Sequence, residues 1–162
     1  MRGKLIYITT LVASLALLSA CEPEPQPIQY GGDQCEYCRM MITDPEFGSQ
    51  VLNKQGRSFK FDSVECMAAF DLTFDDQDNI HSRWVPDFLD KDTWLNAESA
   101  FYLHSETLRS PMGLYLSAYE SRVTAEQMRD EYGGEIIRYD QVKMIVENEW
   151  LSGNGRSQPM HQ

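Results

Sequence analysis

Positive charge is scarce in this sequence, where 14 Lys and Arg residues stand against 25 Asp and Glu residues and give a net charge of −11 at pH 7. A strongly acidic surface repels nucleic acid and anionic lipid, so neither is expected as a partner. The chain also holds only three His and four Cys. It lacks a traceable Ser/His/Asp arrangement, a phosphate-binding loop and a paired-carboxylate signature, and we expect a binding protein that catalyses no reaction.

Long apolar runs are also lacking beyond the N-terminus. There, Arg2 and Lys4 precede the uncharged segment 5–20, which ends in small residues. A short basic start followed by such a run is typical of a secretory signal peptide. A membrane-spanning helix is less favoured, because spanning needs ~20 apolar residues and this run contains several hydroxyl side chains.

The end of this run resembles the lipobox of bacterial lipoproteins, with the sequence Leu18-Ser19-Ala20-Cys21. In that class the Cys becomes the first mature residue and carries the lipid, so Cys21 is predicted to anchor the chain to a membrane. Glu22 follows, whereas an Asp there would resemble an inner-membrane retention signal. We therefore expect a periplasm-facing protein on the outer membrane, with the inner membrane as the alternative.

The remaining chain is long enough for one domain with a real core. We expect a signal peptide over 1–20, a lipidated Cys and flexible Pro/Gly tether over 21–34, a folded domain over 35–151 and a flexible tail over 152–162.

Within the domain, strand and helix patterns alternate. Gly56 predicts a turn between strands at 49–52 and 58–61, and a helix capped by Asp62 is expected to bury a stripe that includes Leu72. The further expected elements are an irregular or edge strand at 83–88 around Pro86, strands at 100–104, 114–119 and 136–139, a helix from Thr124 to Gly133-Gly134, and a last helix capped by Asp140. Strand, strand, helix, strand thus occurs twice, in halves of roughly 35–90 and 95–151. This order predicts an α+β domain with antiparallel sheets.

Candidate chemistry concentrates in the segment Cys35-Glu36-Tyr37-Cys38-Arg39-Met40-Met41. Thiolate and thioether sulfurs select Cu(I) over hard ions, because ligand and metal are both polarizable. In an extended segment Cys38 and Met40 point to the same side, and the flexible Met40 can reach a metal held by the Cys38 thiolate. Met41 faces the other way and is expected in the core. Since the ligand is a thiolate, binding should strengthen as the pH rises.

Other interpretations of the Cys-x-x-Cys pair remain open. A thiol–disulfide oxidoreductase site needs a preceding strand and a following helix, whereas a tether precedes Cys35 and the segment 42–45 is no helix. Structural zinc needs four ligands, and only Cys66, His81, His104 and His161 are left to complete a site. A disulfide between Cys35 and Cys38 would close a very short and strained loop.

Three segments resemble the NosL family, the accessory lipoproteins of nitrous oxide reductase. The segment 35–40 resembles its CxxCGM opening, 61–67 (FDSVECM) its Cys-Met segment at the first helix, and 110–113 (SPMG) its PMG segment. The resemblance implies two tandem ββαβ units and a periplasmic Cu(I) chaperone, with Cys38 and Met40 as copper ligands and Met112 nearby. Arg39 replaces the expected Gly and would be strained if the position needs a positive φ.

Met112 is the first choice for a third ligand, since it lies on a turn between Pro111 and Gly113. Cys35 could ligate, support Cys38 or pair with it, whereas Cys66 lies beside the apolar helix stripe and is expected to be a small buried hydrophobe. The resemblance also implies partners: nitrous oxide reductase and its ABC-type maturation complex. The alternative function is a thiol–disulfide oxidoreductase of the cell envelope.

Overall fold

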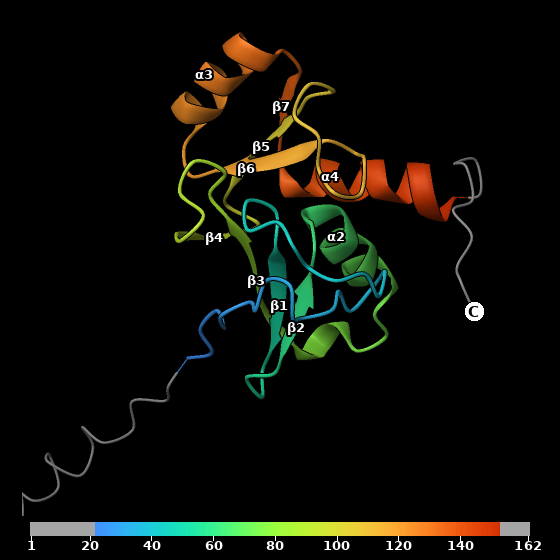
Figure 1. The fold of residues 1–162 in the computed structure, drawn as a ribbon. Coiled ribbons are helices and arrows are strands. Elements are labelled where there is room, and N and C mark those ends of the chain that lie inside the picture. The colour runs from blue at the N-terminus through green and yellow to red at the C-terminus, as the bar shows by residue number, and fades with distance from the viewer. Residues whose placement is uncertain (1–21, 153–162) are drawn as a thin grey trace, which may run out of the picture.

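The computed structural model describes residues 22–152, which form two antiparallel sheets and three α-helices (Figure 1). The strand orders are β2-β1-β3-β4 and β6-β5-β7. The elements are β1 (Ser49–Asn53), β2 (Ser58–Phe61), α2 (Val64–Thr73), η1 (Gln77–Asn79), β3 (Ile80–Pro86), β4 (Trp94–Asn96), β5 (Phe101–His104), β6 (Leu116–Tyr119), α3 (Arg122–Tyr132), β7 (Glu135–Ile137), α4 (Tyr139–Val146) and η2 (Glu147–Leu151). The order β1-β2-α2-β3 and then β5-β6-α3-β7 confirms the α+β class with two ββαβ-type units.

The β1–β2 hairpin forms as the sequence predicts. The Asn53 side chain accepts hydrogen bonds from the backbone N–H groups of Gln55 and Arg57, and Gly56 has a φ of +80°. A positive φ is costly for residues with a Cβ, so Gly at this position lets the chain reverse. All of β1 is buried, because α2 packs on this hairpin and β1 lies between β2 and β3.

The segment before Cys35 contacts the domain. The Gln26 backbone exchanges two hydrogen bonds with the Gln50 side chain, and Lys60 Nζ donates to the Pro27 carbonyl oxygen at 2.7 Å. Ile28 is buried in the main core. Residues 26–28, in the range expected to be a flexible tether, thus contact the domain, and Ile28 is their apolar anchor.

The strand around Pro86 is not an edge strand, so the edge alternative of the prediction was wrong. β3 lies inside the first sheet, where Gln50 pairs with Trp84 on one side and Trp84 with Asn96 on the other. Pro86 is tolerated because it is the last residue of β3, where the loss of one backbone donor ends the ladder.

The three α-helices begin at positions other than predicted. The observed N-cap residues are Ser63, Ser121 and Arg138, where Asp62, Thr124 and Asp140 were expected. Ser121 Oγ accepts from the Thr124 backbone N–H, so Thr124 is the residue being capped. Leu72 is partly exposed rather than on a buried stripe. The predicted stop at Gly133 is confirmed, with a φ of +72° at the C-cap.

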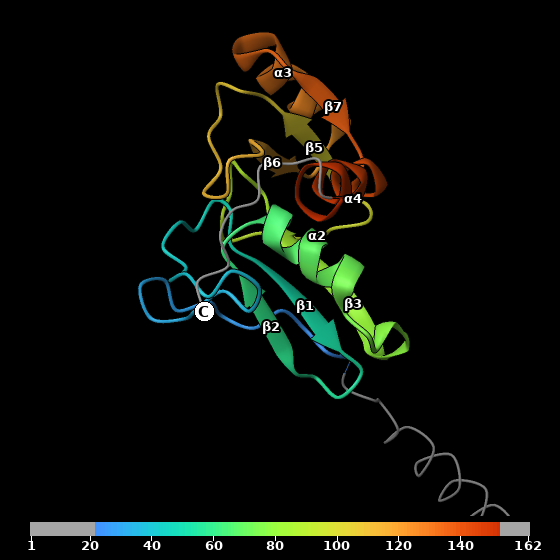
Figure 2. The ribbon, with the colours of Figure 1, turned by 90° about the vertical axis from the view of Figure 1, so that its right-hand side faces the viewer.

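Helices α2 and α4 pack against each other between the two sheets (Figures 1 and 2). Beneath this contact lies a buried ion pair, in which Arg83 donates to Asp71 at 2.6 Å. The Tyr139 hydroxyl donates to the other Asp71 oxygen at 3.4 Å, and Lys143 lies 3.7 Å from it. Because these residues come from α2, β3 and α4, the network fixes the second unit against the first.

The predicted signal peptide, the predicted lipidation site Cys21 and nearly all of the predicted tail lie outside the described residues. Within residues 22–152, no helix combines the length and the apolar character needed to cross a bilayer.

Candidate metal centre

The cysteine loop folds back on itself and is not extended. Cys35 N donates to the Met40 carbonyl at 2.8 Å, Arg39 N donates to the Cys35 carbonyl at 3.0 Å, and Gln34 pairs with Met41 as an isolated bridge. The expectation that Cys38 and Met40 share one side of an extended segment was therefore wrong in its premise. The reversal depends on Arg39, whose φ of +64° lies in the left-handed region. The positive φ that was the condition for strain at this position is thus present, and such a conformation is costly for a residue with a Cβ.

Four side chains meet beneath this loop. The Sγ atoms of Cys35, Cys38 and Cys66 and one carboxylate oxygen of Asp62 all lie within 4.8 Å of one another. We call these four residues the thiol cluster. Asp62 directly follows β2 and Cys66 is in the first turn of α2, so the hairpin and the helix start place two members, and the loop supplies the other two. All three cysteines are free thiols, and the Cys35–Cys38 disulfide considered above is absent.

Cys66 is the ligand candidate that the sequence interpretation ranked too low. It is fully buried, as expected of a small hydrophobe, but its sulfur faces the other two thiols. Asp62 was considered only as a helix cap. The helical spacing rule does not place Asp62 beside Cys66, because Asp62 precedes the extended N-cap Ser63 and lies outside α2.

The pKa values of the cluster members are shifted in different directions. Hydrogen bonds from the Cys35 and Cys66 thiols, aided by the Met40 backbone N–H, lower the pKa of Cys38 to about 4. Hydrogen bonding to the neighbouring sulfurs and burial raise the pKa of Cys66, so its proton is retained. Burial raises the pKa of Asp62 to about 6, and its Oδ2 accepts a 3.5 Å hydrogen bond from Cys38 Sγ when that thiol is protonated. Cys38 is thus a thiolate at neutral pH, favoured by the donor thiols of Cys35 and Cys66 and opposed by the charge of Asp62.

The two methionines of the cysteine loop are exposed, whereas the thiols of the cluster are buried or half-buried. Met40 is 54% exposed and Met41 is 52% exposed, so the expectation of a core Met41 was wrong. Met41 pairs with Gln34 through its backbone, and its side chain faces solvent. Met112 is half-buried against the main core. As copper ligands, Met40 and Met112, together with Cys35 and Cys38, stay predictions.

Two contacts connect the second unit to the cluster. Tyr37, in the cysteine loop, stacks on Trp150 from η2, with 6.4 Å between ring centroids. Ser110 Oγ donates to Oε1 of the buried Glu65, next to Cys66 in α2, and accepts from the Tyr115 backbone N–H at 2.9 Å. The loop that carries Met112 is thereby fixed to the helix start that carries Cys66.

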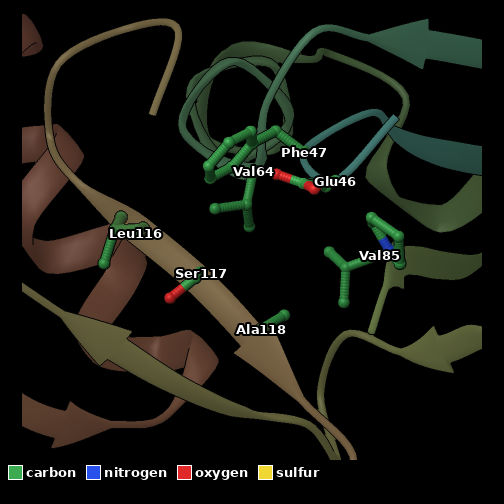
Figure 3. Close-up of a pocket in the computed structure, with 8 residues that line it drawn as sticks. Glu46, Phe47, Val64, Val85, Leu116, Ser117 and Ala118 are labelled. Atoms are coloured by element: carbon green, nitrogen blue, oxygen red, sulfur yellow. The ribbon is translucent and has the colours of Figure 1, made fainter. Parts of the chain in front are cut away.

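A separate pocket lies between the two units (Figure 3). Its volume of about 10 Å³ is enough for roughly one water molecule. Apolar side chains such as Phe47, Val64 and Leu116 line it, and no member of the thiol cluster does. This pocket is too small for an organic substrate, so the thiol cluster remains the candidate site.

Comparisons with known proteins give a consistent answer. A family model described as NosL matches residues 27–146. The chain is similar to the copper-binding lipoprotein NosL of Stutzerimonas stutzeri, with 25% identity over 137 residues that cover 78% of this chain and 71% of the relative. Its fold is similar to the crystal structure of the copper chaperone NosL from Shewanella denitrificans, with a TM-score of 0.65 and 20% identity, covering 75% of this chain and 96% of that one.

Proposed function

The chain belongs to the NosL family, and from this premise we propose that it is a copper chaperone of the cell envelope that carries Cu(I) at the thiol cluster. The observation that carries the proposal is the convergence of three cysteine sulfurs within 4.8 Å. Soft sulfur ligands favour Cu(I) over hard ions. The copper-binding lipoprotein of Stutzerimonas stutzeri, similar over most of this chain, supports the choice of metal.

Cys38 is the primary ligand in this proposal. It is half-buried, whereas Cys35 and Cys66 are fully buried, and its low pKa supplies a thiolate without the cost of deprotonation. Cys35 and Cys66 complete the coordination from inside the protein. Met40 is exposed on the same loop and accepts the ion at the surface, which gives copper a path outward from sulfur to sulfur.

The recipient in this proposal is the assembly apparatus of the copper centres of nitrous oxide reductase, an ABC-type complex in the membrane. A docked partner would add a sulfur or imidazole ligand to an ion that is still bound to Met40, so that the ion moves by ligand exchange. A lipid on Cys21 would hold the protein at the periplasmic face of a membrane, by our expectation the outer one, within reach of such a complex.

The test is a Cu(I) titration of the reduced full-length chain against a competing chelator. Cys38→Ser and Met40→Leu should each weaken binding, Cys38→Ser by several decades because a thiolate is lost. Met144→Leu is the matched control for Met40→Leu, since Met144 is also exposed but lies on α4. Unchanged affinity in both Cys38→Ser and Met40→Leu would contradict the proposal.

One observation favours thiol–disulfide exchange as a second candidate function. A thiolate at Cys38 beside the thiols of Cys35 and Cys66 is chemically able to attack a disulfide and to be resolved by a neighbour. A dithiol reductase assay without copper tests this. Turnover that is lost in both Cys35→Ser and Cys38→Ser would favour redox chemistry. If the unaltered protein shows no turnover above the rate in buffer, copper transport is left as the proposed function.

A further inference from the structure

Lys60, on strand β2, binds the segment that leads into the cysteine loop at three points. Its Nζ atom donates to the Pro27 carbonyl oxygen at 2.7 Å and to Asp33 Oδ2 at 2.6 Å, and its carbonyl oxygen accepts from the Glu36 backbone N–H at 2.8 Å. Residues 26–34, which we call the N-terminal strap, are thereby joined to β2. Copper binding by the thiol cluster leaves these contacts without a role.

The N-terminal strap and the cysteine loop pair as the two arms of one antiparallel hairpin. Gly31 N donates to the Ile42 carbonyl oxygen at 2.8 Å, and Ile42 N donates to the Asp33 carbonyl oxygen at 2.9 Å. The pairing continues to the bond from Cys35 N to the Met40 carbonyl oxygen. The carboxylate that β2 holds thus belongs to the same ladder as two of the ligand candidates.

We propose that Lys60 is a positioning residue for copper binding, which holds this hairpin in the conformation that brings the cysteine loop onto the rest of the thiol cluster. β2 leads directly into Asp62 and, through Ser63, into α2, which carries Cys66. One strand therefore supports the hairpin and also places the two cluster members that lie outside it. The inference rests on the proposed function, since it concerns the residues that would bind Cu(I).

The contact suits this role because it is ionic and largely shielded from water. The side chains of Lys60 and Asp33 are 22% and 27% exposed, and a charge-assisted hydrogen bond is stronger than one between neutral groups. The same Asp33 oxygen also accepts from the Gln29 backbone N–H at 2.8 Å, which fixes the carboxylate. Without the ammonium group the hairpin would populate open conformations, and the apparent affinity for Cu(I) falls with the fraction of closed molecules.

The first measurement is a Cu(I) titration of the reduced full-length chain against a competing chelator. Lys60→Leu should weaken binding about tenfold, since indirect supports of a metal site are worth ~10–100-fold. Lys60→Arg keeps the charge and the donors and should recover most of the affinity. Lys54→Leu is the matched control, because Lys54 is exposed in the turn between β1 and β2, and it should leave the affinity unchanged.

Amide hydrogen exchange of the metal-free chain separates positioning from a general loss of stability. Lys60→Leu should speed the exchange of the hairpin donors Gly31, Cys35 and Ile42 and leave exchange in α3 unchanged. An equal increase in the hairpin and in α3 would overturn the inference, because lost stability would then explain the weaker binding.

The copper titration separates this inference from the proposed function. Unchanged Cu(I) affinity in Lys60→Leu, with binding lost in Cys38→Ser, would overturn the inference and leave copper transport. If the unaltered chain binds no Cu(I), the proposed function fails and the inference fails with it. If Lys60→Leu does not fold, Asp33→Asn decides: it removes the charge from the other side of the pair, and unchanged affinity there would overturn the inference.

Discussion

Replacing Arg39 by Gly should relieve backbone strain, although it removes a charged side chain. Arg39 has a φ of +64°, and the left-handed conformation costs a residue with a Cβ roughly 1–2 kcal/mol. The ion pair that would be lost is weak: Arg39 lies 3.8 Å from Glu36, and the two side chains are 70% and 32% exposed. Such a pair contributes about 0–1 kcal/mol. Glycine adds roughly 0.5–1 kcal/mol of backbone entropy loss on folding, which offsets part of the relief.

The cost of the left-handed conformation is best measured as the difference in stability between Arg39→Gly and Arg39→Ala, because both variants lose the ion pair and only Ala keeps a Cβ. We expect the Gly variant to exceed the Ala variant by about 1 kcal/mol in free energy of unfolding, or roughly 3–5 °C in Tm. Urea unfolding and calorimetry of the metal-free reduced protein measure this difference. Arg57→Ala controls for the ion pair, since Arg57 also lies 3.8 Å from Glu36. Equal stability of the Gly and Ala variants would refute the assignment of strain to Arg39.

Three further predictions concern the cluster and its surroundings. Because the pKa of Cys38 is lowered to about 4, its alkylation by iodoacetamide in the metal-free protein should stay nearly constant from pH 8 to about pH 5 and fall only as the pH drops through about 4; mass spectrometry at this residue measures the rate. Ser110→Ala leaves the buried Glu65 without its donor and should cost about 1–3 kcal/mol in urea unfolding. Gly134→Ala should destabilise the protein by more than ~2 kcal/mol, because its φ is +104° and a Cβ there would overlap the His104 carbonyl oxygen.

Each of these predictions has its own control. An alkylation rate that falls tenfold per pH unit below about pH 8 would indicate an ordinary thiol. Ser99→Ala alters an exposed serine and should leave stability within about 0.5 kcal/mol. Gly133→Ala should cost only the conformational penalty of about 1–3 kcal/mol for a backbone with φ +72° and ψ −175°, since no atom lies within 4 Å of its added Cβ. If Gly133→Ala proves as damaging as Gly134→Ala, the proposed overlap is not the cause.

Local signals made much of the fold predictable. Gly56 and Gly133 occupy positions with positive φ, and the hairpin turn and the helix end that they respectively predict are both confirmed. The caps were harder, because Ser63 and Asp62 are adjacent and either residue type can accept the backbone hydrogen bond of a helix start. The inner place of β3 was not predictable, since it depends on pairing with the three-residue strand β4, which was not predicted from the sequence.

The site was predictable in its chemistry but not in its membership. Cys38 and Met40, two residues apart, indicated a soft-metal site without any knowledge of the fold, whereas the spacing of Cys35 and Cys38 left thiol–disulfide exchange, zinc and a disulfide open. Cys66 and Asp62 join it only because the hairpin returns the start of α2 to the cysteine loop, which is a tertiary effect. The extended geometry assumed for Met40 failed because one left-handed residue, Arg39, reverses the chain between the two predicted ligands Cys38 and Met40.

The most direct test of the central claim is copper X-ray absorption on the reduced full-length chain loaded with one equivalent of Cu(I). We predict a Cu(I) edge and a first shell of three sulfurs without nitrogen or oxygen neighbours, with one sulfur fewer in Cys66→Ser. A first shell of nitrogen and oxygen, or an unchanged sulfur count in that variant, would contradict a copper site at the thiol cluster.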